Sequence, residues 1–179
     1  MPILRPINFK KWIDDNRHLL KPPVNNKVVY EDTEFIVMVV GGPNARKDYH
    51  YNESEEFFYQ LEGNIQVQVQ EEGKAVTVDI KEGEIFLLPP RVPHNPMRGA
   101  NTIGLVMERK RRDNEQDGLM WFCEKCNEPL YDKKFKLTNI MTQFQETFAY
   151  FYGNENLRTC KKCGHMMEPP ILVKEESTH

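Results

Sequence analysis

The chain lacks the features that mark membrane, secreted and nucleic-acid-binding proteins. None of its apolar runs approaches the ~18 consecutive residues that a membrane-spanning helix needs. The first residues, MPILRPINFKKW, contain no apolar stretch before charge returns, so we expect no secretory signal and a cytoplasmic location. With 24 Lys and Arg against 27 Asp and Glu, the 179-residue chain has a formal net charge of -3 and no basic field for a phosphate backbone. We therefore expect neither a membrane nor a nucleic acid among its partners.

Cysteine is scarce, and its placement is informative. The four cysteines form two C-x2-C pairs with 33 residues between them: Cys123, Cys126, Cys160 and Cys163. In a chain without a secretory signal, such pairs indicate metal ligands rather than disulfides. Four thiolates complete a tetrahedral shell around iron or zinc, and the spacing does not choose between these metals. Asn127 and Gly164, which follow the pairs, readily take the positive φ of such a turn, so we expect a structural metal site with His165 as a neighbour.

The apolar pattern changes along the chain from helical to strand-like. After Asn8, a suitable helix N-cap, apolar residues recur at helical spacing until the prolines of LKPPVNN. From Val28 to Arg109 the pattern is that of short strands, including a hairpin in which Ile and Val alternate with Gln over 65–70 before the turn EEGK. The continuous run FIVMVVGG is typical of a strand buried on both faces. Many short strands with Gly and Pro turns predict a mainly β sandwich or barrel.

A charged segment, ERKRRDNEQDG, is the best candidate for a domain boundary. We expect a barrel with an N-terminal helix over 1–112 and a cysteine-bearing extension over 113–179, packed on the barrel. The extension contains an amphipathic helix with Phe144 and Phe148 on its apolar face, which packs either on the barrel or on a second subunit. Gly153 stands where a C-cap glycine belongs. The basic run over 109–112 has the pattern of a solvated loop.

Two histidines and a glutamate are spaced as in a known metal-binding motif. DYHYNESEEFFYQLEG contains His50 and Glu56, with a glycine seven residues after the glutamate, and GEIFLLPPRVPHNP contains His94. These stretches resemble the two motifs of the cupin family, and the resemblance implies a cupin barrel, also called a double-stranded β-helix or jelly roll. Two positions depart from the motifs, because Asn52 stands in place of a second histidine and Arg91 in place of a glycine.

The departure at Asn52 leaves a two-histidine, one-carboxylate set of His50, Glu56 and His94. Such a set binds one side of a six-coordinate ferrous ion and leaves about three positions open for a substrate and dioxygen. A closed structural site for zinc or nickel would leave no open position. The pattern therefore favours Fe(II) and oxygen chemistry.

A wider resemblance covers the chain from about residue 8 to about residue 170. Its segments are GGPNARKDYH, LKPPVNN, EEFFYQLEG, LLPPRVPHNP and the two cysteine pairs. Together they resemble the 3-hydroxyanthranilate 3,4-dioxygenase family, in the variant with an appended rubredoxin-like metal site. The resemblance implies an iron(II) extradiol dioxygenase that opens the ring of 3-hydroxyanthranilate with O2 to 2-amino-3-carboxymuconate semialdehyde. That product is the precursor of quinolinate in the kynurenine route from tryptophan to NAD, and the family further implies a homodimer.

The resemblance also implies residues that bind the substrate. Arg46 lies four residues before the first histidine and Arg98 four residues after the second, so each emerges near a metal ligand and can bind a carboxylate. Glu108 is implied as a hydrogen-bonding group or general base toward the substrate hydroxyl or amine, kept ionised by neighbouring cations. The pocket-lining residues that the resemblance adds are Asn26, Asp48, which orients the Arg46 side chain, and Pro96.

Two other functions compete with this hypothesis. The first is a different cupin oxygenase or isomerase that acts on another small acid; the enzymes of this class with three histidines and a glutamate are disfavoured by Asn52. The second is a non-enzymatic metal-ribbon interaction module with a vestigial barrel. Retention of both arginines and Glu108 around an intact ligand set speaks against the vestigial barrel.

Overall fold

The structure, a computed structural model, describes residues 3–22 and 25–171. Its elements follow one another in this order: α1 (Phe9–Asn16), η1 (Arg17–Leu19), β1 (Asn26–Val28), β2 (Phe35–Gly41), β3 (Tyr49–Tyr51), β4 (Glu56–Glu62), β5 (Ile65–Glu71), β6 (Lys74–Ile80), β7 (Ile85–Leu88), β8 (His94–Arg98), β9 (Ile103–Arg109), β10 (Asp117–Phe122), β11 (Pro129–Phe135), α2 (Ile140–Tyr152) and α3 (Glu155–Arg158). The predicted mainly β class is confirmed. No helix in these ranges is both long enough and apolar enough to cross a membrane.

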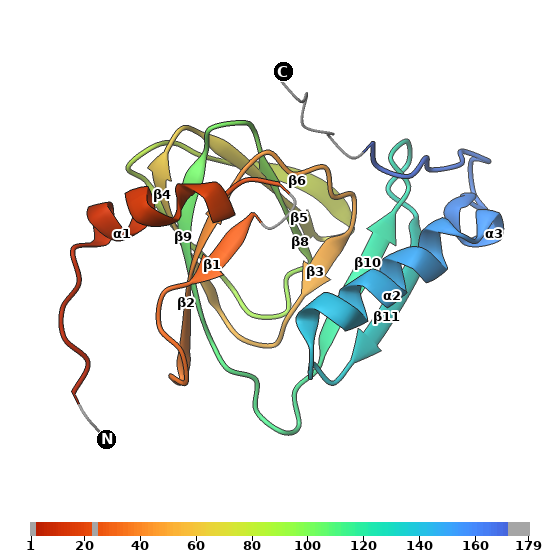
Figure 1. Ribbon diagram of the computed structural model, residues 1–179. Coiled ribbons are helices and arrows are strands. Elements are labelled where there is room, and N and C mark those ends of the chain that lie inside the picture. The colour runs from red at the N-terminus through yellow and green to blue at the C-terminus, as the bar shows by residue number, and fades with distance from the viewer. Residues whose placement is uncertain (1–2, 23–24, 172–179) are drawn as a thin grey trace, which may run out of the picture.

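Two antiparallel sheets form the body of the molecule. One has the strand order β1-β2-β9-β4-β7 and the other the order β11-β10-β3-β8-β5-β6 (Figure 1). Side chains from both sheets meet in a buried cluster that includes Phe58 and Val106 of the first sheet and Val67 and Ile80 of the second. The barrel is therefore held by burial of apolar surface between the sheets.

Local signals in the sequence account for the first helix and for the hairpin. The Asn8 side chain accepts a hydrogen bond of 3.0 Å from the Lys11 backbone N–H and so caps α1 as predicted. In β5 the apolar residues are buried and the intervening glutamines are not, and β5 pairs with β6 across the predicted turn. Glu72 and Gly73 both take positive φ there, 48° and 76°, as a two-residue hairpin turn requires.

The prediction that the run over 35–42 is buried on both faces was wrong. Phe35 at the start of β2 is 58% exposed, whereas Val39 further along is fully buried. The difference follows from α1, whose Ile13 packs with Val39, Leu20 and Ile103 over one end of the sheet only. The continuous apolar run therefore corresponds to a strand that α1 and Leu20 bury at one end only.

The extension continues the second sheet. Its strand β10 pairs with β3 of the barrel on one side and with β11 on the other, and α2 lies beside these strands (Figure 1). The apolar face of α2 is used within the chain, because Phe144 and Phe151 pack on Leu119 and Trp121 of β10. Gly153 is the C-cap, as predicted. The proposed division at 112/113 falls in the connection between β9 and β10 and stays a prediction, with residues 1–2 and 172–179 outside the described part of the chain.

Burial of Trp121 is the largest single contribution to the core of the extension. Its side chain has no exposed surface, and its ring stacks on Phe151 with centroids 4.3 Å apart. We expect Trp121→Ala to lower the free energy of unfolding by about 3–5 kcal/mol in urea denaturation, because it opens a cavity. Tyr150→Ala, at a 58% exposed side chain, is the control and should cost less than about 1 kcal/mol. Equal losses for the two variants would contradict this account of the core.

Candidate metal centres

The structure brings the three predicted ligands of the first metal site together. His50 of β3 and His94 of β8 are partners across adjacent strands, and Glu56 begins β4 in the opposite sheet. One ligand atom from each residue lies within 4.8 Å of the others. A two-histidine, one-carboxylate set is thus assembled from both sheets of the barrel.

One ring nitrogen of His94 is hydrogen-bonded to the backbone, and the other is directed at the Glu56 carboxylate. Its Nδ1 lies 3.0 Å from the Val92 carbonyl, to which it can only donate, and its Nε2 lies 3.0 Å from Glu56 Oε2. With Nδ1 as donor, Nε2 and the carboxylate are two acceptors face to face, and either a proton or a cation must lie between them. Burial opposes ionisation of Glu56, but the interactions with His94 and His50 outweigh it and lower the Glu56 pKa to about 2. The pair therefore suits a metal ion that replaces the proton.

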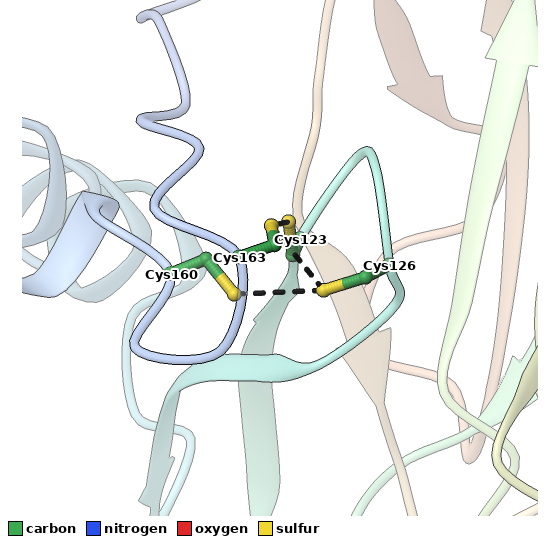
Figure 2. A group of neighbouring side chains, drawn as sticks. All are labelled: Cys123, Cys126, Cys160 and Cys163. Carbon is green, nitrogen blue, oxygen red and sulfur yellow. Dashed lines mark hydrogen bonds between the residues drawn. The ribbon is translucent and has the colours of Figure 1, made fainter.

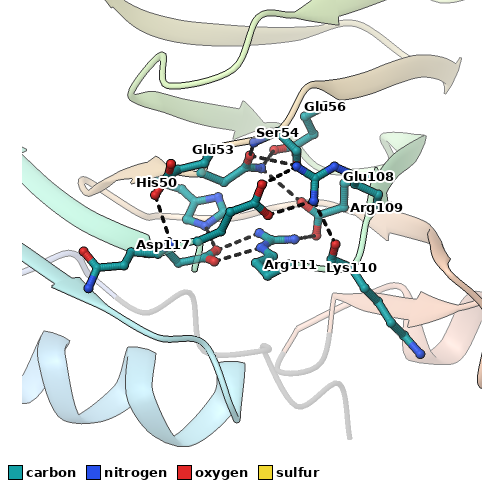
Figure 3. A network of polar contacts seen from close by, with 12 residues as sticks. His50, Glu53, Ser54, Glu56, Glu108, Arg109, Lys110, Arg111 and Asp117 are labelled. Atoms are coloured by element: carbon teal, nitrogen blue, oxygen red, sulfur yellow. Dashed lines mark hydrogen bonds and ion pairs between the residues drawn. The ribbon is translucent and has the colours of Figure 1, made fainter. Parts of the chain in front are cut away.

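His50 is held by a network that includes residues of the connection between β9 and β10 (Figure 3). Its Nε2 lies 2.8 Å from Oδ2 of Asp117, which has no exposed surface. Arg111 donates to Asp117 from Nε at 2.8 Å and from Nη2 at 2.6 Å, and its Nη1 lies 2.9 Å from Glu108 Oε1. A single guanidinium thus joins a carboxylate beside the metal ligand to the predicted general base.

The buried charges around this set do not balance. Glu56, Glu108 and Asp117 supply three carboxylates, and in the described part of the chain the guanidinium paired with them is that of Arg111, which contacts Glu108 and Asp117. With both imidazoles neutral, two negative charges remain uncompensated in a site of low solvent exposure, which is unfavourable. A divalent cation bound by the three ligands would neutralise them, so the donor set and its charge both fit the expected metal.

Glu108 lies directly beside Glu56, because the two are partners across β9 and β4. The Asn52 side-chain amide donates to Glu108 Oε2 at 3.2 Å and approaches Glu56 Oε2 at 3.5 Å. Burial and the charge of Glu56 raise the pKa of Glu108, and Arg111 only partly opposes them. Arg111 is the neighbouring cation that favours the ionised form of Glu108, as expected of a cation beside it, and the ionised state itself stays a prediction. Asn52, which stands in place of the second motif histidine, therefore directs one amide group at both carboxylates.

Arg98 is a buried cation on the same face of β8 as His94 and Pro96. Its side chain is 4% exposed, and Nη1 donates to Gln60 Oε1 at 3.3 Å. Among the described residues, no carboxylate lies within salt-bridge distance of this guanidinium. Burial lowers the Arg98 pKa to about 10, with Glu56 acting in the opposite direction. Such a group is suited to an anion from outside the chain.

Arg46 is arranged differently, because it already has a carboxylate partner. Its guanidinium forms two hydrogen bonds with Asp48, whose side chain is 2% exposed, and it lies over the rings of Phe144 and Phe148 of α2 at 5.5 and 5.7 Å from their centroids. Phe144 also packs on the His50 ring at 5.6 Å. Helix α2 therefore covers this side of the site with aromatic rings.

The four cysteines form a second, separate cluster (Figure 2). Sulfur atoms of Cys123 and Cys163, of Cys126 and Cys160, and of Cys126 and Cys163 each lie 3.5 Å apart. Asn127 and Gly164 take positive φ, 57° and 73°, as predicted. Four thiolates at this spacing fit one tetrahedral ion and leave it no open position.

Comparisons with known proteins identify the family of the chain. A family model described as 3-hydroxyanthranilic acid dioxygenase matches residues 1–152. The chain belongs to the 3-hydroxyanthranilic acid dioxygenase family. Proteins named 3-hydroxyanthranilate 3,4-dioxygenase from Xanthomonas euvesicatoria and Bacillus cereus are 55% and 50% identical to it and cover 94% of the chain, over 95% and 94% of their own lengths. Among solved structures, a cupin-2 domain protein of Shewanella frigidimarina aligns with a TM-score of 0.47 and 20% identity, over 58% of this chain and 94% of that one.

Sequence analysis of this dioxygenase-family chain missed Arg111 and Asp117. The basic run over 109–112 was expected to be solvated, but the Arg111 side chain is only 9% exposed, so that interpretation was wrong for this residue. The spacing of Arg111 three residues after Glu108 was the one available signal, and it is not specific. Of the remaining expected pocket residues, Pro96 lies between His94 and Arg98, whereas Asn26 is exposed at the start of β1 and pairs with Val40. Their roles toward a substrate stay predictions.

The thiolate site should stabilise the extension of this family member without a role for His165. Cys123 is 3% exposed and directly follows β10. We expect Cys123→Ser to release the bound ion and to lower the free energy of unfolding by about 2–4 kcal/mol, within the range of large single-residue effects. His165→Ala is the control and should retain the ion. Metal content per chain and urea midpoints measure both, and equal loss of metal in the two variants would contradict the four-thiolate shell.

Proposed function

We propose that this protein opens the ring of 3-hydroxyanthranilate with O2 and releases 2-amino-3-carboxymuconate semialdehyde, the precursor of quinolinate in the kynurenine route to NAD. The observation that carries the proposal is a two-histidine, one-carboxylate set next to Glu108, in a barrel that also buries Arg98 without a carboxylate partner among the described residues. The curated relatives that match nearly the whole chain bear the name of this enzyme. The chain is therefore assigned as a ring-cleaving dioxygenase with an aromatic substrate.

We infer that His50, Glu56 and His94 hold Fe(II). The three side chains would hold the ion, and ferrous iron bound there would supply a route for electrons between an aromatic ring and dioxygen. The protein contributes the neutral imidazoles, one carboxylate and a surrounding of low solvent exposure. Imidazole and carboxylate ligands suit iron, and the burial of the set limits competing reactions with water.

Arg98 is the residue that best fits the substrate carboxylate. It is a permanently charged, planar donor that is buried without an anion of its own, so binding a carboxylate recovers much of the energy lost on its burial. Arg46 is already paired with Asp48, and it supplies a second, weaker attraction for the same anion. The two arginines approach from β8 and from the segment before β3, so together they orient the ring against the ligand set.

Glu108 is placed to accept the proton of the substrate hydroxyl. Its raised pKa makes it a better base than a solvated glutamate, and Asn52 and Arg111 hold its two oxygens. The phenyl ring of Phe144 covers the His50 side of the site and excludes water there. These residues bind, orient and deprotonate the substrate.

Exposed apolar side chains on the first sheet bear on the oligomeric state of the protein. We propose a homodimer in the cytoplasm, with iron or zinc at the four cysteines as a structural ion. Three apolar side chains on one face of the first sheet support a subunit interface: Phe35, Ile85 and Leu87 are 58%, 66% and 53% exposed. Exposed apolar patches of this kind mark protein–protein contacts.

Loss of the carboxylate ligand should abolish turnover and leave the rest of the protein intact. We expect Glu56→Gln to reduce ring cleavage at least 1,000-fold, or ~4 kcal/mol at the transition state, in an anaerobically reconstituted Fe(II) assay of the semialdehyde absorbance. The four-cysteine ion should remain. Glu55→Gln changes the exposed glutamate next to it and should retain activity. If both variants retained activity, Glu56 would not be a ligand.

The anchoring role of Arg98 is tested at Gly104, which contacts its guanidinium. A Cβ at Gly104 would lie 2.8 Å from both Arg98 Nη1 and Gln60 Oε1. We expect Gly104→Ala to displace the guanidinium and to raise the KM for 3-hydroxyanthranilate about 10-fold, or ~1.4 kcal/mol, with a smaller change in kcat. Gly99→Ala, whose Cβ meets nothing within 4 Å, is the control. An unchanged KM in Gly104→Ala would contradict the anchoring role.

A further inference from the structure

We propose that Asp117 is a positioning residue for the metal ligand His50, and that Arg111 fixes Asp117 and Glu108 in one unit. The inference rests on the proposed metal site but not on the identity of the substrate. Its components come from the connection after β9 and from the first residue of β10, which sequence analysis had placed outside the site. The start of the extension would therefore help to position a metal ligand of the barrel.

The register of β10 explains why Asp117 reaches the histidine. Leu119 is the partner of His50 across β10 and β3, so the side chains of these two residues leave the sheet on the same face. Asp117 lies two residues before Leu119 and shares that face, which places it diagonally across from the imidazole. Its Oδ2 lies 2.8 Å from His50 Nε2. The contact is thus a direct consequence of strand pairing.

A histidine ligand needs such a partner. The carboxylate that accepts one ring N–H leaves the other nitrogen as the metal donor, fixes the orientation of the ring and increases its basicity. His94 has the Val92 carbonyl in this role. On the barrel side, β3 pairs with β8 through His50 and His94 alone, so the backbone there restrains the ring little. Asp117 provides the restraint from the other side.

Arg111 extends this restraint to the opposite side of the ligand set. Two of its nitrogens donate to the two oxygens of Asp117, and the third lies 2.9 Å from Glu108 Oε1. One planar group therefore sets the distance between these two carboxylates. The Arg111 and Glu108 side chains are 9% and 10% exposed. A metal ligand and the general base are therefore positioned by the same guanidinium.

The alternative is that this ion pair only stabilises the fold, and Glu115 provides a matched control for it. Glu115 lies in the same connection, is 8% exposed and forms a two-point ion pair with Arg109. It contacts neither His50 nor any other member of the ligand set in the described structure. Loss of either carboxylate removes a buried partner of an arginine, but only Asp117 should affect metal binding.

The experiment measures Mn(II) affinity of the purified protein, with the four-cysteine ion retained and the histidine site emptied by a chelator. Mn(II) prefers nitrogen and oxygen ligands to thiolates, and its free aquo ion is counted by electron paramagnetic resonance. We expect Asp117→Asn to weaken Mn(II) binding roughly 10- to 100-fold and Glu115→Gln to change it less than about 2-fold. Unchanged affinity in Asp117→Asn, or equal losses in both variants, would overturn the proposal.

Two further variants keep the test decisive. In a His50→Ala background, Asp117→Asn should add less than about 2-fold, because its effect acts through the imidazole; a full additional loss would refute that route. If Asp117→Asn does not fold, Arg111→Lys retains the charge but not the two-point grip, and it should weaken Mn(II) binding about 3-fold or more, whereas unchanged affinity would overturn the proposal. Wild-type protein that binds no Mn(II) would instead contradict the proposed metal site itself.

Discussion

An excess of buried negative charge around His50, Glu56 and His94 is the constraint on which the rest of the site depends. Glu56, Glu108 and Asp117 come from three strands, and the Arg111 guanidinium forms ion pairs with two of them, Glu108 and Asp117. Burying such a group without compensation costs several kcal/mol. A divalent ion would remove the excess, and the Asn52 amide, directed at both adjacent carboxylates, offsets part of their repulsion. Metal binding and the stability of this region are therefore linked.

The same charge argument supports the proposed substrate. Arg98 is buried with an amide as its partner, so a ligand with a single carboxylate restores neutrality where a neutral phenol would not. In the proposed function the carboxylate lies on the Arg98 side and the hydroxyl meets Glu108, which fits an aromatic acid whose hydroxyl is not adjacent to its carboxylate. In the extension, Phe144 packs on the His50 ring, and the cysteine cluster lies beyond the far end of β10. Strand β10 thus carries Asp117 at its start and is followed by Cys123.

Motif spacing together with the cupin resemblance grouped His50, Glu56 and His94, and spacing paired the cysteines; the structure brings each group together. The hairpin of β5 and β6 was predicted from residues close in the chain. Asp117 was not, since it meets His50 across 67 residues and only through the register of β3 and β10. The burial of Arg111 could not be predicted, because the charged residues on both sides of it give the pattern of a solvated loop. The burial of β2 was predicted wrongly for a related reason, because it depends on which part of the strand α1 covers.

The most direct test of the central claim is the stoichiometry of oxygen uptake by protein loaded anaerobically with Fe(II). When 3-hydroxyanthranilate and then air are admitted, the account predicts one O2 consumed for each substrate, with the semialdehyde absorbance appearing in the same proportion and no added reductant. Extradiol cleavage places both oxygen atoms in the product, so none is left to be reduced. Uptake that requires a reductant, or no uptake by a chain that has bound both the iron and the substrate, would contradict it.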